Sequence, residues 1–387
     1  MTSNLTQVHV SEAFVDTFGY EPEGVWSAPG RVNLIGEHTD YNEGFVLPFA
    51  INRRTFAAVA RREDYIARVS SSHSSQVHEI DVREISRETV SDWAAYPLGV
   101  AWAMQQFDNT AVVSGFDCYI DSDVPIGAGL SSSAAIECAV GLALNELWSA
   151  GFERKVLARV AQFAENNIVG APTGIMDQSA SLLAQVDFGV FLDCRTLDAK
   201  VVELGFAREG LELLIIDTKV AHRHADGGYS SRRASCEKGA SAMGVAWLRD
   251  LTTADLDRAR ELLDDETFRR VRHIVTENER VLATVETLEA KGPRAIGDLL
   301  YASHVSMRDD FEISVDELDT AVETSLRHGA IGARMTGGGF GGAAIALTPI
   351  ERISEVTLAV TAEFETLGYA APEIFVVSAA NGACREV

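Results

Sequence analysis

The sequence predicts an α+β protein built from two lobes. The first observation is its length of 387 residues, which is enough for two or three domains. The second is a first half in which strand-like runs alternate with glycine turns. The third is a second half in which helical stretches follow a buried strand. A change of pattern near residue 205 divides the chain into lobes of residues 1–205 and 206–387.

The elements of the first lobe follow from local patterns. Apolar runs bounded by turn residues predict strands at 25–36, 55–62 and 115–124. Apolar residues at helical spacing predict a helix from Ser132 to about Ser149. A second helix is expected over 153–169, because three helix breakers follow it: Gly170, Pro172 and Gly174.

The elements of the second lobe follow in the same way. The run "LELLIIDTK" predicts a buried strand at 211–219. Helical patterns extend over roughly 252–290 and 316–327. A glycine-rich segment, 332–350, and a last strand, 373–380, complete the lobe.

Composition restricts the partners. The chain has 33 basic and 57 acidic residues, a net charge of −24, which argues against nucleic acid or an anionic membrane. We expect no signal peptide and no membrane span. The five cysteines show no CxxC spacing, so we interpret them as buried thiols in a reducing compartment and expect a cytoplasmic protein.

The segment 123–141, "DVPIGAGLSSSAAIECAVG", combines glycines with serines at a helix start. Gly127 and Gly129 allow positive φ and close approach of a ligand. Serine is a preferred N-cap, and the free N–H groups at a helix N-terminus bind phosphate. A serine hydroxyl there can also reach phosphate-bound Mg²⁺. The alternative is a glycine-rich turn before a capped helix; no GK[ST] follows, so this is not a Walker A loop.

The segment 164–181, "AENNIVGAPTGIMDQSAS", carries two carboxylates of interest. Asp177 is expected on an exposed turn, where an aspartate is ordinarily a cap. Beside an arginine such a carboxylate stays ionised and becomes a candidate base. Glu165 is either a solvated residue or an Mg²⁺ ligand, since carboxylate and phosphate oxygens suit that ion.

Two further segments leave alternatives open. "GGGFGG" at 337–342 matches GxGxxG, but a strand-like run follows it, so a dinucleotide fingerprint fails on context. This glycine run either forms a tight contact between the lobes or packs against the phosphate loop or the substrate. The cluster "GRVNLIGEHTDYNEG" at 30–44 is either a solvated turn or a polar binding site.

The order of these segments resembles the GHMP small-molecule kinases, and residues 30–51 resemble the signature of the galactokinases within that family. The resemblance covers most of the chain, in family order: 93–100, 124–135, 170–178, 227–237, 303–314 and 332–347. It implies a ribosomal protein S5 domain 2-like N-terminal lobe, a ferredoxin-like C-terminal lobe and an active site in the cleft between them. It also implies ATP-dependent phosphorylation of the C1 hydroxyl of α-D-galactose.

The resemblance implies a role for particular residues. Sugar contacts are expected at Glu37, His38, Thr39, Asp40, Asp177 and Tyr229, because ionised acceptors bind hydroxyls strongly. The ATP loop is expected at Gly127, Ala128, Gly129, Leu130, Ser131, Ser132 and Ser133, with Trp93 and Tyr96 at the adenine. Mg²⁺ is expected at Ser133 and Glu165. Asp177 corresponds to the proposed base, with Arg31 as its neighbouring cation. One departure is Thr173, where galactokinases often carry cysteine.

Two other functions remain open at this point. A related kinase for N-acetylgalactosamine or arabinose keeps the ATP loop, but the intact "GEHTDYNEG" favours galactose. A regulator that binds galactose and ATP without turnover is disfavoured by the complete serine run. We expect galactose and ATP as the partners, and a monomer.

Overall fold

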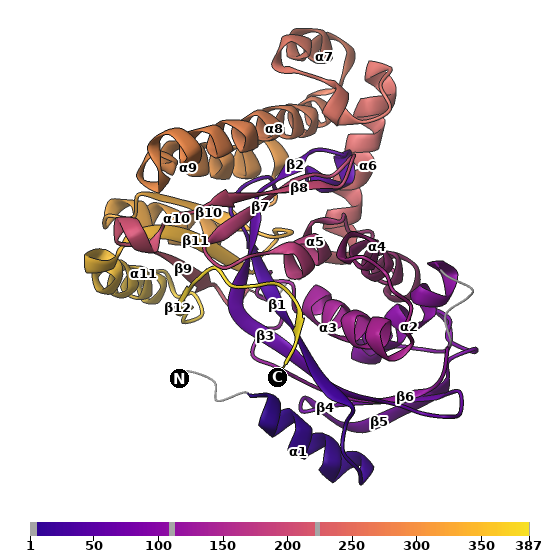
Figure 1. Cartoon of the computed structure of the whole chain (residues 1–387). Coiled ribbons are helices and arrows are strands. Elements are labelled where there is room, and N and C mark those ends of the chain that lie inside the picture. The colour runs from indigo at the N-terminus through magenta and orange to yellow at the C-terminus, as the bar shows by residue number, and fades with distance from the viewer. Residues whose placement is uncertain (1–5, 108–112, 221–224, 387) are drawn as a thin grey trace.

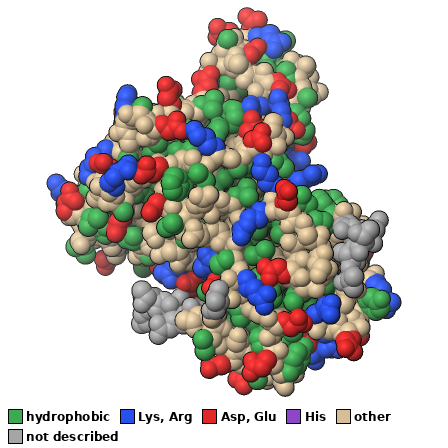
Figure 2. All heavy atoms as spheres, in the orientation of Figure 1, with side chains coloured by type: hydrophobic (Ala, Val, Ile, Leu, Met, Phe, Trp, Pro, Cys, Tyr) green, Lys and Arg blue, Asp and Glu red, His purple; other side chains and the backbone are tan. Residues whose placement is uncertain are grey.

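The computed structural model describes residues 6–107, 113–220 and 225–386 (Figure 1). Within these ranges the strands form three sheets of six, four and three strands. None of the helices in the described ranges has the length and apolar character needed to cross a membrane. Figure 2 shows acidic and basic side chains interspersed over the face in view.

The six-stranded sheet forms the first lobe. Its order is β13 (Cys384–Arg385), β1 (Gly24–Asn33), β3 (Pro48–Arg61), β6 (Phe116–Ser122), β4 (Ile66–Ser71) and β5 (Ser74–Asp81). Alternate residues face opposite sides, so Trp26 and Val25 enter different cores. Helix α1 (Gln7–Phe18) covers the face of Val25.

The other face of this sheet carries a helical layer (Figure 1). It consists of α2 (Ala95–Phe107), α3 (Ser132–Leu147), α4 (Arg154–Ala164) and α5 (Met176–Leu183). The helix expected from Ser132 is confirmed. The helix expected over 153–169 is α4 followed by a wider π turn, Glu165–Val169, which ends at Gly170 with φ 85°.

The four-stranded sheet of the second lobe is antiparallel. Its order is β10 (Gly332–Thr336), β11 (Ala343–Pro349), β9 (Leu211–Asp217) and β12 (Glu373–Val377). Helices separate β9 from β10, and α11 (Ile353–Leu367) separates β11 from β12. This βαββαβ order is the expected ferredoxin-like arrangement.

The remaining helices pack on one face of the second sheet and beyond it. They are α6 (Ala225–Met243), α7 (Leu256–Leu262), α8 (Asp265–Lys291), α9 (Gly297–Ser306) and α10 (Asp316–Arg327). The range expected to be helical, roughly 252–290, is helical but divided, because α7 ends at Leu262 and α8 begins after its N-cap, Asp264. The Asp264 carboxylate accepts the Thr267 N–H at 2.9 Å, as an N-cap does.

The lobes share a core. Leu214 and Ile216 of β9 face the helices of the second lobe, whereas Leu213 and Ile215 face the end of β1 and the segment after it. A small sheet of β2 (Phe45–Val46), β7 (Phe188–Asp193) and β8 (Asp198–Glu203) lies beside α8. The division at residue 205 stays a prediction, and the described chain returns to the first sheet at β13.

Candidate active site

Strand β1 brings Arg31 to the glycine–serine loop. The strand has a register shift between Pro29 and Arg31, and the Arg31 N–H donates to the Leu130 carbonyl at 3.0 Å. The guanidinium NH1 donates to the Gly129 carbonyl at 2.6 Å. A Cβ at Gly30 would lie 2.6 Å from the Leu130 carbonyl oxygen, so only glycine permits this approach.

The structure places Arg31 against Asp177, 146 positions away in the sequence. Arg31 Nε and NH2 both lie 2.8 Å from Asp177 Oδ1. The turn expected at Asp177 is instead the first turn of α5, and the side chain is 22% exposed. A paired carboxylate with an open side can accept a proton from a bound ligand.

Ser131 contacts the same carboxylate from the other side. Its Oγ donates to Asp177 Oδ2 at 2.5 Å. Ser131 occupies the N-cap of α3 with φ 59°, but its side chain makes no capping hydrogen bond. The capping role expected for the serine at the helix start is therefore wrong for Ser131, because Asp177 engages the hydroxyl.

The two glycine runs of the sequence pack against each other. Gly127 and Gly129 have φ of 76° and 72°. A Cβ at Gly337 would lie 3.1 Å from the Gly129 carbonyl oxygen. The second run therefore makes a close contact between the lobes and also supports the first run.

The polar cluster after β1 is folded into a buried turn rather than solvated. Glu37 is buried, its Oε2 lies 2.8 Å from Arg334 NH2, and its Oε1 accepts the Gly337 N–H at 2.7 Å. Asn33 also donates to Glu37. Thr39 donates its hydroxyl to the Gly36 and Phe45 carbonyls at 2.9 and 2.6 Å, which holds the turn together.

His38 and Asp40 lie near aromatic side chains. His38 Nδ1 is 2.7 Å from the Tyr41 hydroxyl, and the rings of His38 and Tyr229 are 4.9 Å apart. Burial, and then repulsion from Asp177, raise the pKa of Asp40 to about 6. Burial, and then the neighbouring His273, lower the pKa of His38 to about 3, so this imidazole is neutral at physiological pH.

Glu165 lies below the serine loop, buried rather than solvated. Its Oε2 accepts the Thr173 hydroxyl at 2.7 Å and the Gln178 amide at 2.8 Å. Burial raises the pKa of Glu165, which hydrogen bonds from Thr173, Gln178 and Ser133 oppose. The described residues contain no group of three or more His, Cys, Asp or Glu suited to a metal. The oxygen donors of Glu165 and Ser133 fit Mg²⁺, which commonly takes one or two protein ligands and completes its shell with phosphate and water.

These side chains line one cavity of about 420 Å³ between the lobes. The expected site residues that line it are Arg31, Glu37, His38, Asp40, Tyr96, Gly127, Gly129, Leu130, Ser131, Ser132, Ser133, Glu165, Asp177 and Tyr229. Three expected residues do not: Thr39, Ala128 and Trp93. Thr39 and Ala128 are fully buried, and Trp93 meets the His78 ring edge-on at 5.5 Å.

Sequence reasoning missed two buried polar residues of this site. Arg334 pairs with Glu37, and Gln178 holds Glu165. A charged residue inside an apolar strand is a signal that identifies Arg334, whereas nothing local distinguishes Gln178 from a surface glutamine.

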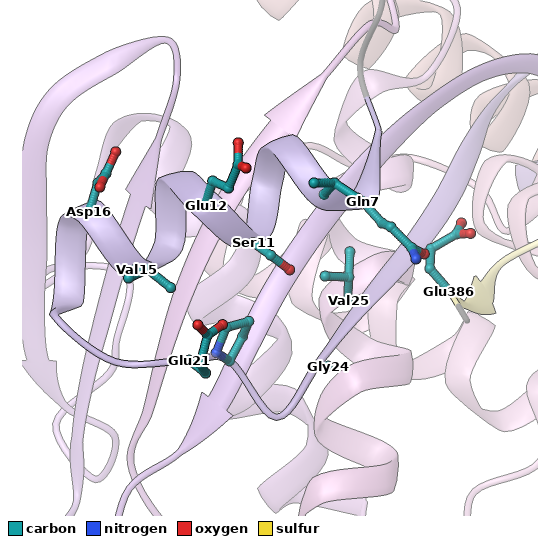
Figure 3. A pocket seen from close by; sticks show the side chains of 11 residues that line it. Gln7, Ser11, Glu12, Val15, Asp16, Glu21, Gly24, Val25 and Glu386 are labelled. Carbon is teal, nitrogen blue, oxygen red and sulfur yellow. The ribbon is translucent and has the colours of Figure 1, made fainter.

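A second cavity, of about 480 Å³, lies between α1 and β1 (Figure 3). Glu12, Asp16, Glu21 and Glu386 surround it. None of the expected site residues lines it, and a cluster of carboxylates disfavours an anionic ligand such as a nucleotide. The cavity between the lobes is therefore the candidate active site.

Comparison with known proteins supports this choice. Residues 95–185 and 284–366 match the N-terminal and C-terminal GHMP kinase domains, and residues 12–61 match the galactokinase galactose-binding signature. A Methanococcus jannaschii mevalonate kinase shares the fold, with a TM-score of 0.65 at 19% identity over 92% of this chain and 98% of that one. Fold and site thus define a GHMP kinase.

Closer relatives refine the assignment. A Streptomyces coelicolor galactokinase is 50% identical over 381 residues, 98% of each chain. A Chloroflexus aggregans galactokinase is 41% identical over 91% of this chain and 90% of its own length. A Lactococcus lactis galactokinase, solved with galactose, has a TM-score of 0.92 at 32% identity over 98% of this chain and 99% of that one. The chain belongs to the galactokinase family.

Proposed function

We propose that this protein transfers the γ-phosphoryl group of ATP to the C1 hydroxyl of α-D-galactose, giving galactose 1-phosphate and ADP, the first committed step in the use of this sugar. The observation that carries the proposal is the Arg31–Asp177 pair in the cavity between the lobes, bounded by the serine loop. The galactose-binding signature and the L. lactis galactokinase solved with galactose support the choice of sugar.

The polar turn after β1 binds the sugar. Glu37, Asp40 and Tyr229 supply oxygen atoms for sugar hydroxyls, and neutral His38 supplies a ring nitrogen. Thr39 acts by holding the turn, since both of its hydroxyl contacts are to backbone. A sugar that leaves these buried protein acceptors without hydroxyl donors binds at a cost in free energy, and this cost gives selectivity among sugars.

Asp177 accepts the proton of the C1 hydroxyl, and Arg31 holds the carboxylate in place. Arg31 also offsets negative charge on the transferring phosphoryl group. Because phosphoryl transfer has a loose transition state, positioning and electrostatics contribute more than proton removal. The Ser131 hydroxyl fixes the second oxygen of Asp177, so one oxygen faces Arg31 and the other Ser131.

The nucleotide binds on the glycine–serine loop and the N-terminus of α3. Its phosphates take the free N–H groups there, which offset the net negative charge of the protein. Tyr96 lines the cavity, which supports a position beside the adenine, while the contact assigned to Trp93 stays a prediction without that support. Mg²⁺ bound at Ser133 and Glu165 would neutralise phosphate charge.

We also propose a monomer in the cytoplasm. The five cysteines are unpaired, as in a reducing compartment, and the proposed reaction consumes ATP.

A coupled ADP-release assay over hexoses and pentoses, with and without Mg²⁺, tests the function. We expect Mg²⁺-dependent turnover with galactose well above that with N-acetylgalactosamine or arabinose. A preference for another sugar contradicts the substrate assignment. Binding of galactose and ATP without ADP release identifies a regulator instead.

A further inference from the structure

A second buried carboxyl lies beside Glu165 and has no part in the proposed reaction. Glu137 is on α3, four residues after Ser133, and its side chain has no exposed surface. Residues four apart on a helix share a face, so Glu137 lies one turn from the expected metal position. No basic side chain among the described residues hydrogen-bonds or ion-pairs with it.

The Gln178 amide bridges the two carboxyls. Its Nε2 donates to Glu137 Oε2 at 3.0 Å and to Glu165 Oε2 at 2.8 Å. Both hydrogens of one amide are therefore used on acceptors from two separate elements, α3 and the π turn after α4. This contact fixes Gln178, which directly follows Asp177, and Gln178 in turn fixes the Glu165 carboxylate.

The bridge has unsatisfied atoms. Glu137 Oε1 and Gln178 Oε1 are buried and have no hydrogen-bond partner within the described part of the chain. Such atoms cost stability, and a leucine or methionine core would avoid that cost. A bridge that persists at this cost beside a metal position indicates a role in holding the ligand, since carboxylates that bind metals are oriented by outer hydrogen bonds.

We propose that Glu137, acting through Gln178, is a positioning residue that holds the Glu165 carboxylate in the orientation that binds Mg²⁺ together with ATP. The inference rests on the proposed function, which places the metal at Glu165. Two hydrogen bonds, from Gln178 to Glu137 and from Gln178 to Glu165, connect α3 with the proposed metal ligand.

Two substitutions break the chain and one preserves it. Gln178→Met removes the bridge and keeps the length of the side chain, and Glu137→Leu removes the outer acceptor. Glu137→Gln keeps an acceptor for Gln178. Glu146→Gln is the matched control, because Glu146 is exposed on the same helix and, within the described ranges, its carboxylate pairs with Arg385 alone.

The readout is the affinity of Mn²⁺ for the protein saturated with a non-hydrolysable ATP analogue, measured by electron paramagnetic resonance. We expect Gln178→Met and Glu137→Leu to weaken Mn²⁺ binding about 10- to 100-fold, the usual effect of losing an outer partner of a metal ligand. Glu137→Gln and Glu146→Gln should stay within about threefold of the parent protein. Galactose affinity, from calorimetry, should be unchanged in all four variants.

Two results overturn the inference. One is unchanged Mn²⁺ affinity in Gln178→Met; the other is a parallel loss of Mn²⁺ and galactose affinity, which indicates a general structural defect. If Glu137→Leu does not fold, the comparison of Gln178→Met with Glu137→Gln decides. Glu165→Ala distinguishes failure of the metal assignment from failure of the positioning role. If Glu165→Ala leaves Mn²⁺ affinity unchanged, Glu165 does not bind the metal and both proposals fail. If Glu165→Ala lowers Mn²⁺ affinity and Gln178→Met does not, only the positioning role of the bridge is refuted.

Discussion

Asp177→Asn tests the proposed chemistry most directly. Asparagine keeps the shape, and its oxygen can still accept from Arg31, which also retains its hydrogen bond to Gly129. The negative charge and the proton acceptor are lost. General-base loss lowers kcat by roughly 10²- to 10⁴-fold. At about 1.4 kcal/mol per decade, this corresponds to about 3–6 kcal/mol of transition-state stabilisation.

The effect on folding is smaller than the effect on rate. The pair is partly open to solvent, with exposed fractions of 6% for Arg31 and 22% for Asp177, and a hydrogen bond replaces the ion pair. We expect a decrease of about 1–3 kcal/mol in the free energy of unfolding, typical of weakening a hydrogen bond between charged groups. The variant should therefore fold and bind both substrates.

The assay is steady-state ADP release over a range of both substrates, with a single-turnover measurement to isolate the chemical step. KM for galactose and for ATP should change only a few-fold. Asp198→Asn is the control, because Asp198 is exposed and, among the described residues, its carboxylate pairs with Lys155 alone, at 3.5 Å. A single-turnover rate within about threefold of the parent protein would refute the role of Asp177 as base, since even the low end of general-base loss is about 100-fold.

Three further predictions follow from the same site. Arg31→Lys should lower kcat by about 100-fold with a smaller change in ATP affinity, because one ammonium cannot replace the planar fork that contacts both Asp177 and Gly129; unchanged kinetics would mean that Arg31 is only structural. Gly174→Ala should weaken galactose binding in calorimetry and leave ATP binding unchanged, because the new Cβ would overlap the Asp40 carboxylate. Gly141→Ala serves as the control, since its Cβ would meet the Val100 side chain at an ordinary distance of 3.4 Å. Equal galactose affinities in the two variants contradict this prediction. Galactose affinity should fall as pH decreases through about 6, where Asp40 becomes protonated. The stability of the unliganded protein should change in the opposite sense: because folding raises the pKa of Asp40, the free energy of unfolding should decrease as pH rises from about 4 to about 6. A galactose affinity that does not change between pH 5 and 8 contradicts the role of Asp40 as an ionised acceptor.

The sequence predicts the features that depend on local pattern. The helix at Ser132 follows from helical periodicity, and the strand expected at 211–219, observed as β9, follows from its apolar run. The break before α8 was also present locally, as an N-capping aspartate at 264, but the long helical pattern on both sides obscured it. Helix α5 has only eight residues, too few for periodicity to distinguish it from a turn, which explains the error at Asp177.

What the sequence cannot predict depends on long-range packing. Only the family resemblance predicts the approach of Arg31 to Asp177, because no local pattern links positions 146 residues apart. Serine is a preferred N-cap residue, but the left-handed backbone of Ser131 directs its hydroxyl to the Asp177 carboxylate on another helix. The pairs Glu37–Arg334 and Glu137–Gln178 form only when separate elements meet, and no local pattern identifies buried partners of this kind.

The return of the chain to β1 has a consequence for how the protein folds during synthesis. Ser27 and Cys384 are neighbours in the first sheet although 357 positions separate them. Arg54 of β3 also donates to the carbonyls of Asn381 and Gly382 at 2.8 and 3.1 Å. The outer edge of β1 therefore lacks its partner until the ribosome has released residues near 384. An N-terminal half with this open edge presents unpaired N–H and C=O groups to strands of other chains, and a contact between positions 357 apart should form late in folding.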